Sequence, residues 1–177
     1  MPSRNAILPV LILATLIGCG ANSPPLAVVD SVDIDRYMGL WYEIARYPNW
    51  FQNDGCQYTT AQYTLRDDGK VTVLNQCHDR WPDGDRQSIE GTARVVDTTT
   101  NAKLKVGFFL FFEGDYWIID LDDEYQWALV GEPSRNYLWI LSRTPTLDEA
   151  VYNDILSRLP EQGYDPNGLV LTAQPDS

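Results

Sequence analysis

Short segments in which apolar and polar residues alternate make up most of the chain between residues 40 and 142. Alternation with a period of two is typical of strands that bury one face, and clusters of Asp, Gly, Asn and Pro separate the segments. The pattern predicts an all-β protein with about eight strands. The expected strands are residues 40–47, 59–65, 71–77, 88–97, 104–108, 116–121, 127–131 and 137–142.

One helix is expected after the last of these strands. Thr146 and Glu149 have the spacing of a capping box, in which each side chain satisfies a free backbone N–H. Pro160 ends the helix, and residues 169–172 are expected to form a short final strand. The apolar stripe of the helix, which we expect to pack on the outside of the sheet, consists of Leu147, Val151, Ile155 and Leu159.

The first strand carries the segment around which the chain is organised. Gly39 is followed two residues later by Trp41, and the alternation of strand side chains places Trp41, Glu43 and Ala45 on one face. The opposite face then carries Tyr42, Ile44 and Arg46. An unpaired carboxylate inside a protein is costly, so we expect Arg143 or a tyrosine hydroxyl to pair with Glu43.

The order of these features resembles the lipocalin family. Gly39-x-Trp41 opens the first strand, residues 120–125 form an Asp-rich turn that ends in Tyr125, and Arg143 follows the last strand. Residues 41–46 and 137–145 make the resemblance close to the bacterial outer-membrane branch, and it extends from Asp33 to Gln174. It implies an eight-stranded antiparallel up-and-down barrel with one C-terminal helix outside. In such a barrel Arg143 packs over Trp41 by a cation–π contact and closes one end.

The N-terminus has the pattern of an export signal. Arg4 precedes an apolar run, residues 6–17, that is too short to span a membrane. The run ends in Leu-Ile-Gly before Cys19, which resembles the bacterial lipobox; the alternative is an ordinary secretory signal with a chance cysteine. The resemblance implies a lipoprotein signal peptide over 1–18, a lipidated tether over 19–32 and a barrel domain over 33–174. Gly20, where an Asp would retain a lipoprotein at the inner membrane, implies the outer membrane, with the barrel facing the periplasm.

The chain contains three cysteines. Lipidation of Cys19 leaves Cys56 and Cys77, an even pair in an oxidising compartment, and we predict a disulfide between them. Counting back from the hairpin turn at 67–69 places Cys77 opposite residue 59, so the bond requires a bulge. The alternative is that one of the two is the nucleophile of an enzyme built on the same scaffold.

Composition argues against several kinds of function. The net charge of −12 argues against an electrostatic nucleic-acid site and against electrostatic docking on anionic headgroups. One histidine, no metal-ligand spacing and no glycine-rich phosphate loop predict a protein that is not an enzyme and holds no metal or cofactor.

The inward positions of the predicted barrel suit an amphiphilic ligand, with an acyl chain inside and a polar head at the mouth. The predicted ligand-binding residues are Trp139, Tyr137, Tyr116, Tyr63, Phe108, Ile118 and Val106. The other inward positions are expected to be Ala61, Leu65, Val71, Val73, Ile89, Gly91, Ala93, Val95, Leu104 and Leu141. These positions favour a carrier of fatty acids or lysophospholipids, and the family resemblance implies the same, with a role in membrane maintenance under stress.

Two apolar segments lie outside the strand faces. Trp50 and Phe51 are adjacent in a polar loop, where exposure of both rings is costly. They are expected to fold over the mouth of the barrel as a lid; the alternative is contact with the membrane or a partner. Residues 108–112 are too uniformly apolar for one strand face, so some are expected at the barrel rim.

Overall fold

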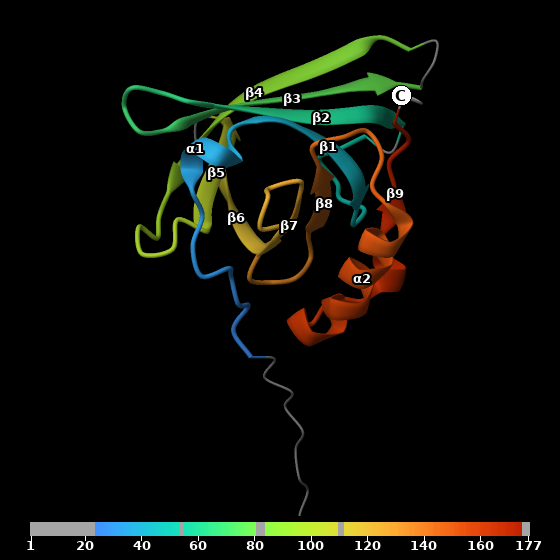
Figure 1. Cartoon of the computed structure of the whole chain (residues 1–177). Helices are drawn as coiled ribbons and strands as arrows, with labels where there is room; N and C mark the ends of the chain where they lie inside the picture. The colour runs from blue at the N-terminus through green and yellow to red at the C-terminus, as the bar shows by residue number, and fades with distance from the viewer. Residues whose placement is uncertain (1–23, 54, 81–83, 110–111, 175–177) are drawn as a thin grey trace, which may run out of the picture.

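The computed structural model describes residues 24–53, 55–80, 84–109 and 112–174. These residues form one antiparallel barrel with a helix on its outside (Figure 1). The eight long strands are β1 (Gly39–Arg46), β2 (Cys56–Leu65), β3 (Val71–Asp79), β4 (Arg86–Val95), β5 (Lys103–Phe109), β6 (Phe112–Leu121), β7 (Trp127–Gly131) and β8 (Leu138–Ser142). The remaining elements are α1 (Ile34–Tyr37), α2 (Glu149–Arg158), the 3₁₀ turns η1 (Leu159–Gln162) and η2 (Pro166–Gly168), and β9 (Val170–Leu171).

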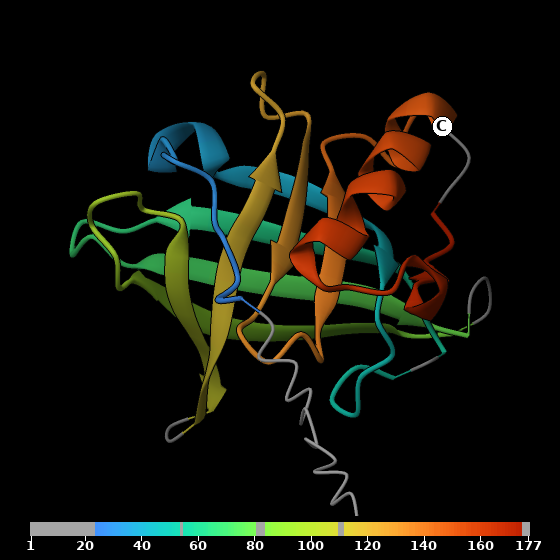
Figure 2. The same ribbon diagram turned by 90° about the horizontal axis from the view of Figure 1, so that it is seen from below.

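Each long strand pairs with the next one along the chain, and β1 pairs with both β8 and β2. This closure confirms the up-and-down barrel. One end, which we call the closed end, holds α1 and the β2–β3, β4–β5 and β6–β7 turns (Figure 2). The other end, which we call the open end, holds the β1–β2, β3–β4, β5–β6 and β7–β8 connections.

A β-bulge interrupts β1 between Glu43 and Ala45. Because a bulge adds one residue to a strand, it reverses which side chains face inward beyond it. Arg46 therefore lies opposite Trp139 and points into the barrel, whereas Ala45 lies opposite Ile140 and packs against the outer cluster. The prediction from simple alternation, with Ala45 inward and Arg46 outward, is wrong at these two positions.

The C-terminal segment fills the seam that the bulge opens between β1 and β2. The β1–β2 pairing ends at Tyr42 and Thr60, and β9 then pairs with the end of β1. Beyond β9, the N–H of Tyr58 donates to the carbonyl of Ala173, so the same segment also contacts β2. The expected final strand is thus present, although it is only two residues long, and it completes the barrel wall at the open end.

Helix α2 covers the outside of β6, β7, β8 and β1, as expected (Figure 2). Ile155 and Leu159 are fully buried against this outer cluster. The predicted capping box is wrong: the helix begins at Glu149, and the carboxylate of Asp148 accepts from the N–H groups of Ala150 and Val151. Aspartate is as good an N-cap as threonine, so the helix starts two residues later than the capping-box pattern predicts.

The bonded cysteines confirm the predicted disulfide and the need for a bulge. Cys56 and Cys77 are joined, with their Cα atoms 5.4 Å apart. The β2–β3 register shifts between Gln57 and Thr60, and Tyr58 takes a positive φ of 57° at the shift. This irregularity brings Cys56 within bonding distance of a residue that regular pairing would place three positions away.

The guanidinium of Arg143 lies 3.8 Å above the ring of Trp41 at the closed end. It also donates to the carbonyls of Arg36, Leu40 and Tyr125, and so joins α1, β1 and the β6–β7 turn. Gly39 has a φ of 100°, and a Cβ on it would lie 3.2 Å from this guanidinium. The predicted pair of Trp41 and Arg143 is therefore present, and the sequence requires Gly39 for two independent reasons.

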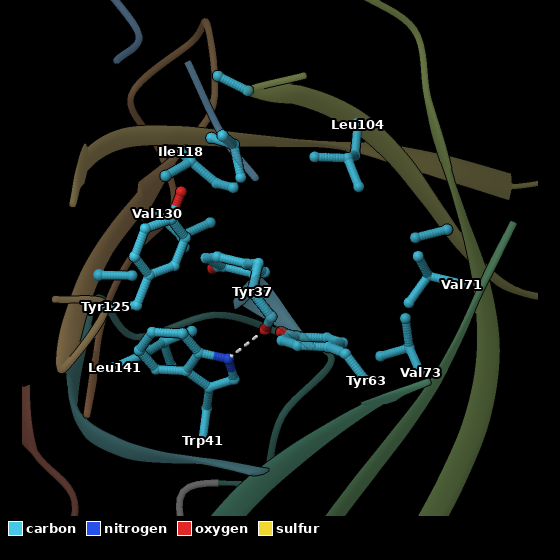
Figure 3. Close-up of a cluster of buried hydrophobic side chains, with 14 residues drawn as sticks. Tyr37, Trp41, Tyr63, Val71, Val73, Leu104, Ile118, Tyr125, Val130 and Leu141 are labelled. Carbon is cyan, nitrogen blue, oxygen red and sulfur yellow. Dashed lines mark hydrogen bonds between the residues drawn. The ribbon is translucent and has the colours of Figure 1, made fainter. Parts of the chain in front are cut away.

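The Trp41 side chain is fully buried among inner-cluster residues, and its Nε1 donates to the carbonyl of Tyr37 at 2.9 Å (Figure 3). We expect Trp41→Ala to lower the free energy of unfolding by about 3–5 kcal/mol, because it leaves a large cavity and removes the contact with Arg143. Chemical denaturation followed by circular dichroism measures this change.

The matched control is Trp50→Ala, since Trp50 is 87% exposed. This variant should change the free energy of unfolding by no more than about 0.5 kcal/mol. Equal stability losses in the two variants would contradict a structural role specific to Trp41.

Candidate functional site in the barrel interior

Three tyrosine hydroxyls meet near the closed end of the interior. Tyr116 Oη lies 2.7 Å from Tyr37 Oη and 3.0 Å from Tyr63 Oη. Burial is the main reason that the pKa of each phenol is raised, to about 12 for Tyr63. All three therefore stay protonated at neutral pH and place hydroxyl groups in the part of the interior nearest the closed end.

The wall beside this group is apolar, because Val73 pairs with Tyr63 and Leu104 pairs with Tyr116. Val71, Val73 and Leu104 are buried, and Figure 3 shows their side chains directed inward from the strands that face Tyr37 and Ile118. Further inner side chains pack against this cluster and are only partly buried. These residues are Ala61, Val95, Val106, Phe108, Tyr116 and Trp139.

The small residue Gly91 does not leave an open space on β4, where it was expected to help make room. A Cβ on Gly91 would lie 2.6 Å from the ring of Phe108 and 2.7 Å from the carbonyl of Gly107. The glycine instead allows the Phe108 side chain to lie across β4, so this ring narrows the interior.

The aromatic residues of the open end contact one another. The ring of Phe51 lies 5.3 Å from that of Tyr137 and 6.4 Å from that of Trp139, measured between centroids. Phe51 thus folds back over the inward face of β8, as the lid prediction required. Trp50 does not, because it contacts Phe51 edge-on and remains exposed.

A buried polar cluster adjoins this aromatic group. Glu43 is buried, its carboxylate accepts from the amide of Gln52 at 2.9 and 3.1 Å, and Thr172 Oγ1 donates to it. Arg46 Nε lies 3.5 Å from the same carboxylate. The expected partners, Arg143 or a tyrosine hydroxyl, are therefore wrong, because the bulge in β1 turns Arg46 inward and β9 brings Thr172 alongside.

Burial raises the pKa of Glu43, and the hydrogen bonds from Thr172 and Gln52 and the charge of Arg46 oppose this shift. The carboxylate also holds the β1–β2 loop, since Gln52 follows Phe51 directly and its backbone N–H donates to the side chain of Asn49 at 2.8 Å. The cluster thus fixes the position of Phe51 over the interior.

A separate pocket of about 240 Å³ opens at the seam beside β9. Its lining residues are Arg46, Pro48, Cys56, Gln57, Val170, Leu171 and Thr172. None of the predicted ligand-binding residues contributes to it, so it is distinct from the interior site.

The structure brings all seven predicted ligand-binding residues to the inner face of the barrel or to its rim. Tyr63 and Tyr116 lie in the lower interior, Val106 and Phe108 on the wall, and Tyr137 and Trp139 at the open end. Ile118 is fully buried within the inner cluster and has no surface to offer a ligand. Their role in binding remains a prediction.

Two predicted inward positions are not buried, although the unbroken β2–β3 and β3–β4 pairing gives them the same parity as the inner residues Tyr63 and Ala93. Leu65 is 41% exposed because it is the last residue of β2 before the hairpin turn, and Ile89 is 39% exposed in the part of β4 nearer the open end. The residues that the sequence-based list of ligand-binding residues missed are Tyr37, Phe51 and the Glu43 cluster. The adjacent aromatic residues at 50–51 indicated a role for Phe51 at the barrel mouth. No sequence pattern indicated that Thr172 and Gln52 would pair with Glu43.

The structure adds two negative observations for the residues it describes. No group of three or more His, Cys, Asp and Glu side chains among them is arranged to hold a metal ion. Within the same part of the chain, no helix is long and apolar enough to cross a membrane. The predicted signal peptide and Cys19 lie outside the described residues.

The family described as "Lipocalin-like domain" matches residues 32–174. The chain is 42% identical to the outer membrane lipoprotein Blc of Escherichia coli, over 97% of this chain and 99% of the relative. It is 43% identical to temperature-induced lipocalin-1 of Arabidopsis thaliana, over 86% and 84% of the two chains.

More distant matches also cover most of the chain. Apolipoprotein D of Macaca fascicularis is 34% identical over 86% of this chain and 82% of its own. Among solved structures, insecticyanin from Manduca sexta superposes with a TM-score of 0.69 at 20% identity, covering 86% of each chain. At that identity the superposition supports the fold alone.

The buried Glu43 generates a prediction about stability and pH. Because its pKa is raised in the folded protein, the folded state holds the proton more tightly, and stability falls as pH rises from about 4.5, the ordinary value, through the folded pKa. Glu43→Gln cannot titrate. We therefore expect the free energy of unfolding of this variant, relative to the unsubstituted protein, to increase between pH 4 and pH 8 in urea titrations.

The control is Glu113→Gln on the outside of the barrel. The hydrogen bond from Arg94 is the main reason that the pKa of Glu113 is lowered, so its contribution is lost as pH falls and the relative stability of this variant should change in the opposite direction. A parallel response of the two variants would show that Glu43 does not titrate as its burial requires.

Proposed function

This chain is a member of the lipocalin-like family, and from that premise we propose that its barrel binds amphiphilic lipids such as fatty acids or lysophospholipids in the cell envelope. We further propose that lipid on Cys19 anchors it to the outer membrane, with the barrel in the periplasm, where it stores or moves these lipids, including during membrane maintenance under stress. The name of the Escherichia coli relative, an outer membrane lipoprotein, supports the location.

One observation carries the ligand proposal: the inner face is apolar along its wall and polar at both ends. An acyl chain can lie along Val106, Phe108 and Trp139, with the hydroxyl groups of the three tyrosines on its closed-end side. A polar headgroup at the open end would meet Tyr137 and the Glu43 cluster. A chain with one polar end satisfies both the apolar wall and the polar rim.

The structure does not favour the alternative of a cysteine-dependent enzyme. That reading requires a reactive thiol at Cys56 or Cys77, and both sulfur atoms are used in the disulfide. His78, the one histidine of the chain, contacts the ring of Tyr58. We therefore propose binding and transport as the function.

The anchor has its own test. We expect Cys19→Ala to abolish acylation and normal processing, because the thiol is the point of lipid attachment. Mass spectrometry of the N-terminal peptide and fractionation of the cell envelope measure both effects. Outer-membrane localisation of an unacylated Cys19→Ala protein would contradict the proposed anchor.

The ligand site is tested at Trp139, which β8 places on the inward face beside Tyr137 and Phe51. We expect Trp139→Ala to weaken the binding of oleic acid and oleoyl-lysophosphatidylethanolamine about tenfold, equivalent to about 1.4 kcal/mol, because it removes a large apolar contact. Isothermal titration calorimetry measures the affinity.

Two conservative variants distinguish a loss of lipid affinity from a loss of the fluorescence signal. Trp139→Phe should retain most of the affinity but lose the change in tryptophan fluorescence that the lipid produces. Trp117→Phe, on the outward face of β6, should alter neither. Unchanged lipid affinity in Trp139→Ala would place the ligand elsewhere.

A further inference from the structure

We propose that the open end of the barrel docks on the phospholipid surface of the membrane, with Trp50 inserted among the headgroups, so that the interior opens directly onto the bilayer. The proposal rests on the proposed lipid anchor at Cys19. It concerns the orientation of the barrel and the surface that meets the membrane, neither of which the anchor alone specifies.

The first step is the point at which the N-terminal segment becomes fixed to the barrel. Arg135, in the β7–β8 connection, donates from Nη2 to the carbonyl of Pro24 at 2.6 Å. Arg135 is itself held by the carbonyl of Gln162 at 2.7 Å, and Leu26 is buried in the outer cluster. From there the segment follows the outside of the barrel to α1, as the blue ribbon in Figure 2 shows, and the N–H of Val29 donates to the carbonyl of Ile118.

The chain is therefore attached at the open end before it reaches the closed end. Four residues lie between Cys19 and Pro24, and the five residue steps from one to the other reach about 17 Å at full extension. A ten-residue strand such as β6 is about 30 Å long. The anchor can place the open end at the membrane, but it is too short to let the closed end face the bilayer.

The second step is the surface that this end presents. Trp50 is 87% exposed and Phe51 is 53% exposed, and the two rings contact each other edge-on. Tryptophan is enriched at membrane interfaces because its ring is apolar while its N–H remains hydrogen-bonded. The same ring in water at the end of a loop is costly.

The loop that carries Trp50 is held in place. Asn49 Oδ1 accepts from the N–H of Gln52, whose amide donates to the buried Glu43, and Phe51 packs on Tyr137. Since Phe51 and Gln52 are directed toward the barrel, Trp50 is left pointing away from it. A fixed, outward aromatic loses little conformational entropy on insertion.

The net charge of the protein argues that this surface docks through apolar contacts and not through attraction between opposite charges. The protein carries a net charge of −12, so an anionic bilayer repels it at long range. Docking therefore relies on the anchor and on apolar insertion. Added salt should preserve or strengthen the contact, whereas it would weaken attachment through basic residues.

The experiment uses the full-length acylated protein in vesicles of phosphatidylethanolamine and phosphatidylglycerol, with and without brominated acyl chains, which quench nearby tryptophan. We expect strong quenching both at 0.05 M salt, where screening is weak and the Debye length is about 14 Å, and at 0.5 M salt, where screening is strong and the Debye length is about 4 Å. Trp50→Phe should lose most of this quenching. Trp127→Phe, the matched replacement at the closed-end start of β7, should retain it.

Trp139→Phe separates docking from ligand uptake, because a brominated lipid inside the barrel would quench Trp139. If lipid binding fails but docking holds, Trp139→Phe is quenched like the unsubstituted protein and Trp50→Phe still loses its signal. If Trp50→Phe and Trp127→Phe are quenched equally, the docking proposal is overturned even where Trp139 reports uptake. Absence of acyl chains in the mass of the N-terminal peptide would overturn the proposed anchor and, with it, the docking proposal.

Discussion

The stacking of Arg143 on Trp41 is the interaction on which the closed end depends. The guanidinium covers the buried indole, and its N–H groups reach carbonyls of three segments that are distant in the chain. The start of β1, helix α1 and the β6–β7 turn are thereby held in one arrangement. Sequential hairpins determine the pairing of each strand with the next. The barrel closes only when β1, which is paired with β2, is also held against β8.

Most of the barrel was predictable from alternation and turn residues, since these are local properties of each strand. On β8, parity alone placed Trp139 and Leu141 on the inner face, as the structure has them. The same rule failed on β1 after Glu43, because a bulge depends on how the neighbouring strands meet and leaves no mark in the alternation. The helix was likewise predicted, but its N-cap is Asp148 and not Thr146, so its first residue lies two positions later than predicted.

The polar part of the candidate site could not be predicted from the sequence. Glu43 was recognised as an inward carboxylate, yet its partners come from a loop and from a segment 129 residues away. Contacts of this kind depend on tertiary placement and have no periodic signal. The apolar wall was easier, because each of its residues follows from the parity of its own strand. Gly91 shows the limit even there: its missing side chain makes room for Phe108, not for a ligand.

The two ends of the barrel differ in how β1 is joined to β2. At the closed end, β1 pairs with β2 through regular backbone register from Gly39 to Tyr42. Toward the open end this pairing stops, and the seam is joined by two-residue β9 and by the Gln174 amide, which donates to carbonyls on both strands. Side-chain bonds at a seam can be replaced or rearranged without loss of the strand ladder that defines the fold. The irregular residues of β1 and β2 are thus concentrated where the interior meets its surroundings, while the regular pairing that keeps the barrel closed lies at the opposite end.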